Sequence, residues 1–236
     1  MTMDRSKKSD ISQRGNVFFI ILIGIVLFAA LMFTFSRGVR QGTESMSGRE
    51  AELIASDVVA YGQKVQRGIE RMIGRGISES DISFANPVDT NYVNLNCTNN
   101  KCLVFNPEGG AVGWKDAPSG TNAGDLYFFG PNRVGTVDGV TKNIGTTARD
   151  LVMILPVEPL ICDSINGITS KLATWKTAGP INITNRFTGD YLVSAGTTIS
   201  YDNDPIQPTT GCFCTGAGAT CTGTDPHYYF TVLLAR

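Results

Sequence analysis

The sequence predicts an α+β protein in which a long N-terminal helix packs on a mostly antiparallel β-sheet domain whose loops are held by disulfides. An unbroken apolar run from Val17 to Phe35 is followed by a helical hydrophobic period that extends to Arg75. From Ile77 onward, short β-type runs lie between Gly, Pro, Asn and Asp, and all six cysteines follow residue 96. The predicted organisation is a basic leader over residues 1–15, a transmembrane helix over 16–36, an amphipathic continuation over 37–76 and an external β-rich globular domain over 77–236.

The apolar run has the length of a membrane-spanning helix. At about 1.5 Å per residue it measures roughly 28 Å, close to the hydrocarbon thickness of a bilayer. Arg5, Lys7, Lys8 and Arg14 precede the run, and Asp4 and Asp10 are the only acidic residues there. This basic excess favours a cytoplasmic N-terminus, although two arginines just beyond the run reduce the asymmetry. Everything after about Arg37 is therefore expected outside.

A secretory signal peptide is the alternative interpretation of this segment, since it also has a basic start and an apolar core. Its core is normally about 7 to 15 residues long and precedes a cleavage site of the A-x-A type. The run here is longer, and only Ala29-Ala30 offers small residues. The pattern favours an anchor.

The stretch from Glu44 to Arg75 predicts an amphipathic helix that rests on the globular domain. Its apolar residues recur in steps of three and four, which places them on one stripe. Gly38, Gly42 and Gly48 predict a bend or local melting between the two helical segments, because each glycine costs roughly 1 kcal/mol relative to Ala. The stripe consists of Ile54, Val58, Tyr61, Val65, Ile69, Met72 and Ile73, and the opposite face carries Glu50, Asp57, Lys64, Arg67, Glu70 and Arg71.

The rest of the chain predicts strands and one short helix. Pro159 can start the helix and Gly167 can end it. The last run is apolar enough for a central strand buried on both faces, and a partner-binding aromatic edge is the alternative. The expected strands are Leu103–Phe105, Leu126–Phe129, Leu151–Leu155, Tyr191–Val193, Thr197–Tyr201 and Tyr228–Leu234.

An even number of cysteines on the predicted external side indicates disulfides in an oxidising compartment. Local spacing favours Cys97 with Cys102. Cys162 with Cys212 and Cys214 with Cys221 are the further expected pairs. Zinc is the alternative for the last three cysteines, but their spacing lacks the paired C-x-x-C pattern and the only histidine, His227, lies beyond them.

A basic leader ending in Gly15, an apolar helix that starts the mature chain at Asn16, an amphipathic continuation and a cysteine-bearing β domain together resemble a type IV pilin or a type II secretion pseudopilin. In that family a membrane peptidase cuts after the glycine and methylates the new N-terminus. The resemblance is close over residues 5–75 and extends to the globular part only in plan. It implies a subunit of the bacterial inner membrane, with its C-terminal domain periplasmic or surface-exposed in a filament.

The partners implied by this resemblance are membrane lipid, the prepilin-type peptidase and other pilin-like subunits that contact Val17 to Phe35. The sequence departs from the family at two positions. Pilins usually begin the mature chain with Phe or Met, where this chain has Asn16, and most have Glu at the fifth mature position, where this chain has Ile20.

The Glu at the fifth mature position is thought to pair with the next subunit's N-terminal amine, and an unpaired charge in an apolar environment costs several kcal/mol. A minor class of pseudopilins that lacks this Glu is thought to sit at the filament tip. The resemblance therefore favours a minor or tip subunit.

The main alternative is a non-cleaved, single-pass envelope protein with an exported partner-binding domain. In that case Gly15 is only a leader residue and Ile20 is one more lipid-facing side chain. The sequence displays no convergent acid-base cluster around His227 and no phosphate-binding glycine motif before a helix, so no enzyme activity and no cofactor are expected.

Twenty basic and 21 acidic residues nearly balance, which argues against a specific nucleic-acid partner. One cation site remains a candidate. Asp202, Asn203 and Asp204 place three oxygen-bearing side chains in one turn, and some pseudopilins carry calcium in a C-terminal loop. An ordinary Asx-rich turn is the favoured interpretation of these residues.

Overall fold

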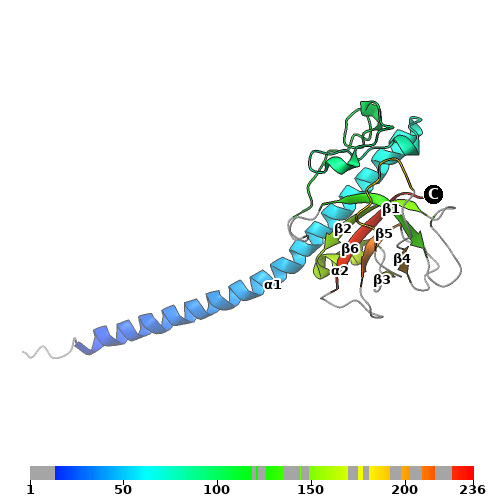
Figure 1. Ribbon diagram of the computed structural model, residues 1–236. Helices are drawn as coiled ribbons and strands as arrows, with labels where there is room; N and C mark the ends of the chain where they lie inside the picture. Colours follow the sequence, from blue (N-terminus) through cyan, green and yellow to red (C-terminus); the bar gives the residue numbers. More distant parts are fainter. Residues whose placement is uncertain are drawn as a thin grey trace, which may run out of the picture. The chain divides into compact units, whose positions relative to one another are not determined.

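The computed structural model describes residues 14–118, 121, 126–135, 144, 149–169, 175–177, 181–191, 198–201, 209–215 and 225–236. Within α1, the side chains of residues 14–18, 30–31 and 33–47 are outside this description. The chain forms two compact units, Met1–Arg49 and Glu50–Arg236. Figure 1 labels the helices and strands.

Helix α1 spans Arg14–Gly74 and belongs to both units. It is helical through Gly38, Gly42 and Gly48, so the local melting predicted there is not observed. In the part of the chain that the structure describes, no helix combines the length and the hydropathy needed to cross a membrane. The transmembrane helix predicted over residues 16–36 is therefore not confirmed and stays a prediction.

The second unit contains six described strands in a closed barrel with the order β1-β2-β6-β5-β3-β4. Four of the pairings are antiparallel (β1–β2, β2–β6, β5–β6 and β3–β4), whereas β1–β4 and β3–β5 are parallel. The predicted α+β class with a mostly antiparallel sheet is thus confirmed, while closure into a barrel was not predicted. The strands are β1 Phe128–Gly135, β2 Asp150–Val157, β3 Trp175–Thr177, β4 Thr198–Tyr201, β5 Thr210–Cys214 and β6 His227–Leu234.

Two apolar cores lie on the two faces of the central strands. Along β2, Leu151, Met153 and Leu155 belong to the core that includes α1, whereas Val152 and Ile154 belong to a second core inside the barrel. This alternation follows from the two-residue period of a strand. β6 lies between β2 and β5 and is buried on both faces, as predicted for the last strand.

The predicted apolar stripe of α1 packs on the outer face of this barrel. Val58, Tyr61, Val65, Ile69 and Met72 are all buried in the outer core. Ile54 and Ile73 are partly buried against the same core. The predicted amphipathic helix therefore forms, and its polar face stays largely in solvent.

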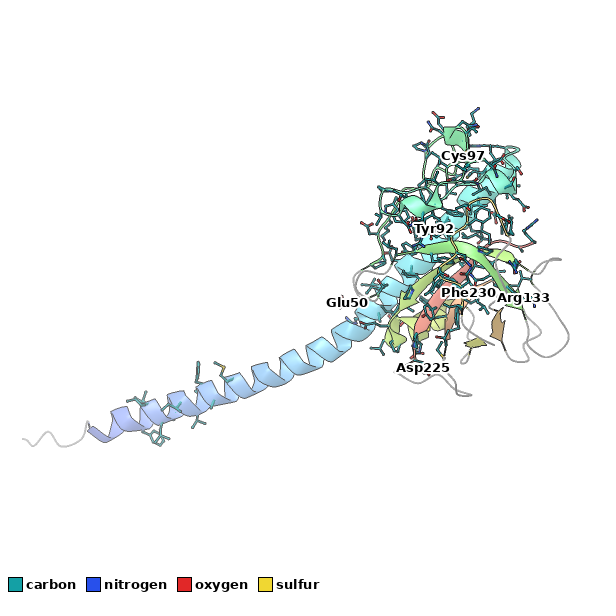
Figure 2. The ribbon with its side chains drawn as sticks, viewed as in Figure 1. Glu50, Tyr92, Cys97, Arg133, Asp225 and Phe230 are labelled. Carbon is teal, nitrogen blue, oxygen red and sulfur yellow. A yellow bond between two sulfur atoms is a disulfide. The ribbon has the colours of Figure 1, made fainter. Side chains whose placement is uncertain are left out.

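Three short 3₁₀ turns order the segment between α1 and the barrel: η1 Glu79–Asp81, η2 Thr90–Tyr92 and η3 Asn100–Cys102. Figure 2 shows Tyr92 near the barrel end of this segment and Cys97 at its outer end. The strand predicted at Leu103–Phe105 is wrong, because Leu103 makes only an isolated bridge to Ser83. Asparagine and glycine around it favour turns over a ladder.

The other strand predictions have mixed outcomes. β2, β4 and β6 lie where strands were expected, and the predicted strand Leu126–Phe129 overlaps only the start of β1. Tyr191 is not in a strand, and the rest of the predicted strand Tyr191–Val193 lies outside the described residues. β3 and β5 were not predicted.

Helix α2, Pro159–Thr169, starts at the predicted proline and continues two residues past Gly167. Its buried residues Ile161, Cys162 and Ile165 share one face, and a disulfide joins Cys162 to Cys212 on β5. The Asn166 amide adds two hydrogen bonds to the Cys212 backbone, donating to its carbonyl (3.0 Å) and accepting from its N–H (2.8 Å). α2 is therefore fixed to β5 both covalently and by hydrogen bonds.

Candidate functional site

The first candidate site is the apolar segment at residues 19–29 of α1, which is exposed along its whole length. Its large side chains are between 46% and 64% exposed, and it contains no charged or polar residue. A helix that is apolar on all sides is normally buried, either in a large core or in a membrane. Residues 19–29 therefore form a continuous apolar surface that the described residues do not cover.

The processing residues predicted from the sequence lie at the beginning of this helix. α1 starts at Arg14, so Gly15 and Asn16 fall in its first turn. Ile20, at the position where most pilins have Glu, is 61% exposed. No carboxylate lies among residues 19–29 to neutralise a nearby amine.

Among the described residues, two of the three predicted disulfides have both partners placed and are formed, Cys97–Cys102 and Cys162–Cys212. Cys214 is disulfide-bonded as well, but Cys221, its expected partner, lies outside the described residues, so that pairing stays a prediction. A sulfur in a disulfide is not a thiolate ligand, which removes Cys212 and Cys214 from the zinc alternative. His227 begins β6, one residue before the predicted strand, and its Nδ1 lies 2.6 Å from the Asp225 carbonyl oxygen.

The candidate calcium residues Asp202, Asn203 and Asp204 lie outside the described residues. Within the described ranges, no group of three His, Cys, Asp or Glu side chains is placed to hold a metal ion. The described residues therefore offer no candidate metal site beyond those proposed from the sequence.

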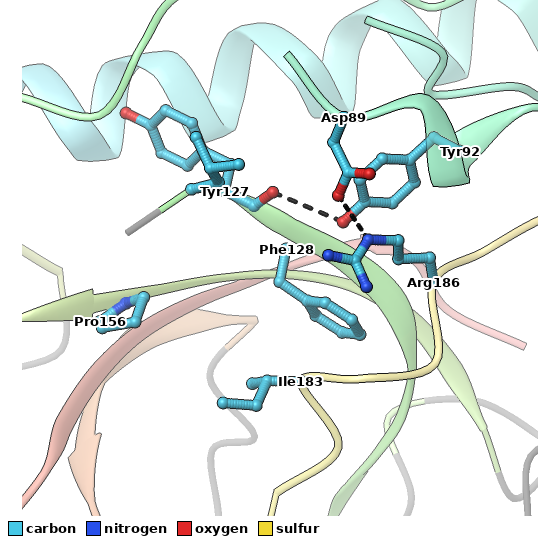
Figure 3. Close-up of a pocket in the computed structure, with 8 residues that line it drawn as sticks. Asp89, Tyr92, Tyr127, Phe128, Pro156, Ile183 and Arg186 are labelled. Atoms are coloured by element: carbon cyan, nitrogen blue, oxygen red, sulfur yellow. Dashed lines mark hydrogen bonds and ion pairs between the residues drawn. The ribbon is translucent and has the colours of Figure 1, made fainter. Parts of the chain in front are cut away.

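The second candidate site is a pocket of about 240 Å³ in the second unit. Its walls come from four places in the sequence: η2 and the residue before it, the start of β1, the end of β2 and the segment 181–187. Figure 3 shows these side chains around one cavity. The lining residues are Asp89, Tyr92, Leu126, Tyr127, Phe128, Pro156, Ile183 and Arg186.

An ion pair between Asp89 and Arg186 forms the polar wall of the pocket. The Arg186 Nε donates to Asp89 Oδ2, and an Arg186 terminal nitrogen donates to the Thr184 carbonyl at 3.2 Å. Asp89 is 8% exposed. Burial alone would raise the pKa of Asp89, but hydrogen bonds from the Asn91 N–H and the Arg186 guanidinium outweigh burial and hold this pKa below its usual value.

Tyr92 fixes the geometry of the pocket where β1 begins. Its hydroxyl accepts a hydrogen bond from the Phe129 N–H (2.9 Å) and donates to the Tyr127 carbonyl (3.5 Å). The Arg186 guanidinium lies over the Tyr92 ring, 5.6 Å from its centroid. Burial raises the pKa of Tyr92 to about 12, so its hydroxyl remains a donor at neutral pH.

Sequence reasoning named none of the pocket residues as a site. Asp89 and Arg186 are 97 positions apart, and neither stands in a recognisable motif. The barrel brings them together because Phe187 donates its N–H to the Phe129 carbonyl, which places the segment 181–187 beside β1. Only a correct prediction of this long-range pairing could have found the site.

Comparison with models of protein families, with curated proteins and with solved structures finds no match for this chain.

Proposed function

We propose that this chain is a structural subunit of a pilin-like or pseudopilin filament, minor or tip-located, which is inserted in the membrane before assembly. The observation that carries the proposal is the exposed apolar helix at residues 19–29. Burial of apolar surface is worth about 25 cal/mol per Å², so side chains of this kind strongly favour lipid or other apolar helices over water. Lipid takes up the helix before assembly, and neighbouring helices contact it afterwards.

Three further features support this proposal. The basic leader up to Gly15 precedes the apolar helix as in prepilins. The amphipathic part of α1 packs on a β-rich domain, which is the plan of a pilin subunit. The disulfides Cys97–Cys102 and Cys162–Cys212 agree with an exported domain.

The side chain at position 20 supports a minor or tip role within such a filament. A bulk subunit uses a carboxylate there to neutralise the amine of its neighbour in an apolar surrounding. Ile20 cannot do so. A subunit at the tip has no neighbour on one side, and an apolar residue at this position then carries no electrostatic cost.

The second candidate function is a non-cleaved, single-pass envelope protein whose exported domain binds a partner. The pocket whose polar wall is the Asp89–Arg186 ion pair favours this candidate, since a filament subunit does not need such a cavity. The two candidates differ on whether the leader is removed.

The decisive experiment is N-terminal sequencing and intact mass of the protein purified from its own membranes, with and without reduction. We expect an N-terminus at Asn16 that carries a methyl group, and a gain of six hydrogens on reduction for the six cysteines. An intact leader beginning at Met1 would overturn the pilin-like proposal and leave the anchored partner-binding protein.

A matched pair of variants sharpens this test. Gly15→Leu should block cleavage and leave the full mass, because the peptidase family cuts after glycine. Gly24→Ala, in the middle of the apolar segment, should be processed normally, since a methyl group there meets no atom within 4 Å. Equal processing of both variants would argue against a prepilin-type cut at Gly15.

A further inference from the structure

Hydrogen bonds within the protein use most of the acceptor capacity of Asp89, whereas Arg186 keeps donors for a ligand. Asp89 Oδ1 accepts from the Asn91 N–H (2.9 Å) and the Asn91 side-chain amide (2.8 Å), and its Oδ2 accepts from Arg186. The Arg186 guanidinium has five N–H groups, of which two are used, so three have no partner among the described residues. The polar wall therefore selects a ligand with an acceptor oxygen.

The remaining donors of Arg186 face the cavity. Figure 3 shows the terminal nitrogens of Arg186 turned away from Asp89 and toward the Phe128 ring. Asp89 and the Tyr92 ring hold the guanidinium in place, so little side-chain entropy is lost when a ligand binds. A planar guanidinium with free N–H groups matches a carboxylate best, because two parallel hydrogen bonds can form.

The rest of the pocket is apolar and small. Its apolar wall consists of Leu126, Phe128, Pro156 and Ile183. The pocket opens to solvent beside Leu126 and Ile183, which are 36% and 38% exposed. Its volume of about 240 Å³ is below the range of roughly 300 Å³ or more that is usual for drug-sized ligands. It suits a single amino-acid side chain or a molecule of that size.

We propose that the pocket binds an apolar group that carries a carboxylate, with the carboxylate on Arg186 and the apolar group among Leu126, Phe128, Pro156 and Ile183. This chemistry has two sources, a free small carboxylic acid or the C-terminal residue of a polypeptide. The site is independent of the filament proposal, because every residue that lines it belongs to the second unit.

The test uses the full-length protein in non-ionic detergent micelles and calorimetric titration with two matched probes, 3-phenylpropionate and 3-phenylpropionamide. We expect the carboxylate to bind at least about tenfold more tightly than the amide, since a charge-assisted pair replaces a neutral hydrogen bond. Uptake by the micelles works in the opposite direction and favours the neutral amide. Equal affinities, or no binding of either probe at millimolar concentration, would overturn the proposal.

Two pocket variants and one control locate the binding. Arg186→Gln should weaken the binding of 3-phenylpropionate at least about tenfold. Ile183→Asp should also weaken binding at least about tenfold, because it places a negative charge where the pocket opens. Since Ile183 is exposed, this variant should fold even if Arg186→Gln does not fold. Arg67→Gln changes an exposed arginine that hydrogen-bonds its own helix at the Gln63 carbonyl, and it should leave binding unchanged. Binding that survives Ile183→Asp would contradict the assignment.

A second pair of probes distinguishes the two sources. The tripeptide Gly-Gly-Phe with a free carboxylate is compared with its C-terminal amide. Tighter binding of the tripeptide acid than of 3-phenylpropionate identifies a polypeptide C-terminus as the ligand. Binding of 3-phenylpropionate alone identifies a free acid.

Discussion

Residues 19–29 and residues 51–73 belong to the same helix, α1, but their apolar side chains have opposite surroundings. In the first region every residue is exposed, and the side chain of Phe19 is 64% exposed. In the second region Val58, Val65 and Ile69 are completely buried on one face, while charged residues occupy the other. The helix geometry is the same, so the difference comes from the residue pattern.

This difference shows in which part of α1 the rest of the chain covers the apolar side chains. A stripe with steps of three and four residues matches one neighbouring surface, and the barrel supplies that surface. A helix that is apolar on all sides has no polar face to leave in water, so no single surface of the same domain can cover it. Residues 19–29 therefore stay exposed, whereas residues 51–73 contribute one face to the domain core.

The largest expected effect compares one isoleucine from each region. Ile69→Ala should lower the free energy of unfolding by about 3 kcal/mol, because it leaves a cavity in the outer core. Ile21 is 53% exposed, so Ile21→Ala should lower the free energy of unfolding by less than about 0.5 kcal/mol. Guanidinium unfolding of the full-length protein in detergent measures both values through Trp114, whose ring packs edge-on against Phe105. Similar losses for the two variants would break the comparison.

The second test compares two glycines of α1. A methyl group at Gly62 would collide with the buried Tyr229 hydroxyl and would lie 3.0 Å from Thr231 and 3.1 Å from Met153. Gly62→Ala should therefore cost about 2 kcal/mol, since overpacking typically costs 1–3 kcal/mol. Gly24→Ala meets no atom within 4 Å and should change the unfolding midpoint little. A stabilised Gly62→Ala protein would show that α1 does not approach the barrel this closely.

The sequence was sufficient for elements whose pattern is local. The α1 stripe, β2 and β6 have clear periods of 3.6 or continuous apolar character, and Pro159 marks the start of α2. β3 and β5 were missed because β3 has only three residues and β5, Thr210–Cys214, includes Gly211, which weakens a strand on its own. Both are held by pairing with distant strands, including the parallel β3–β5 contact that closes the barrel.

The two candidate sites likewise differ in whether a local sequence pattern predicts them. The exposed apolar helix could be predicted because its residues are consecutive. The pocket could not, because Asp89 and Arg186 become neighbours only when the segment 181–187 lies along β1. Nothing in the local spacing of either residue indicates the other.

A third test concerns Tyr61, which is buried on the apolar stripe of α1 that packs on the barrel. Burial raises the pKa of Tyr61 to about 12. Between pH 10 and 12 the unfolded chain loses this proton and the folded chain keeps it, so stability falls as the pH rises through this window. Tyr61→Phe should therefore be about 1.4 kcal/mol more stable relative to wild type at pH 11 than at pH 8. An identical pH dependence of the two proteins would place Tyr61 in solvent.

The smallest expected effect concerns the ion pair between Asp57 of α1 and Lys115. The two side chains are 45% and 44% exposed, so water screens their attraction and both lose rotamer freedom on pairing. Asp57→Asn should change the free energy of unfolding by less than about 0.5 kcal/mol, and added salt should reduce even this difference. Equilibrium unfolding at low and high ionic strength measures it. If Asp57→Asn lowered the free energy of unfolding as much as Ile69→Ala, charge and not the buried stripe would hold α1 on the barrel. The contrast with residues 19–29 would then no longer follow from apolar burial.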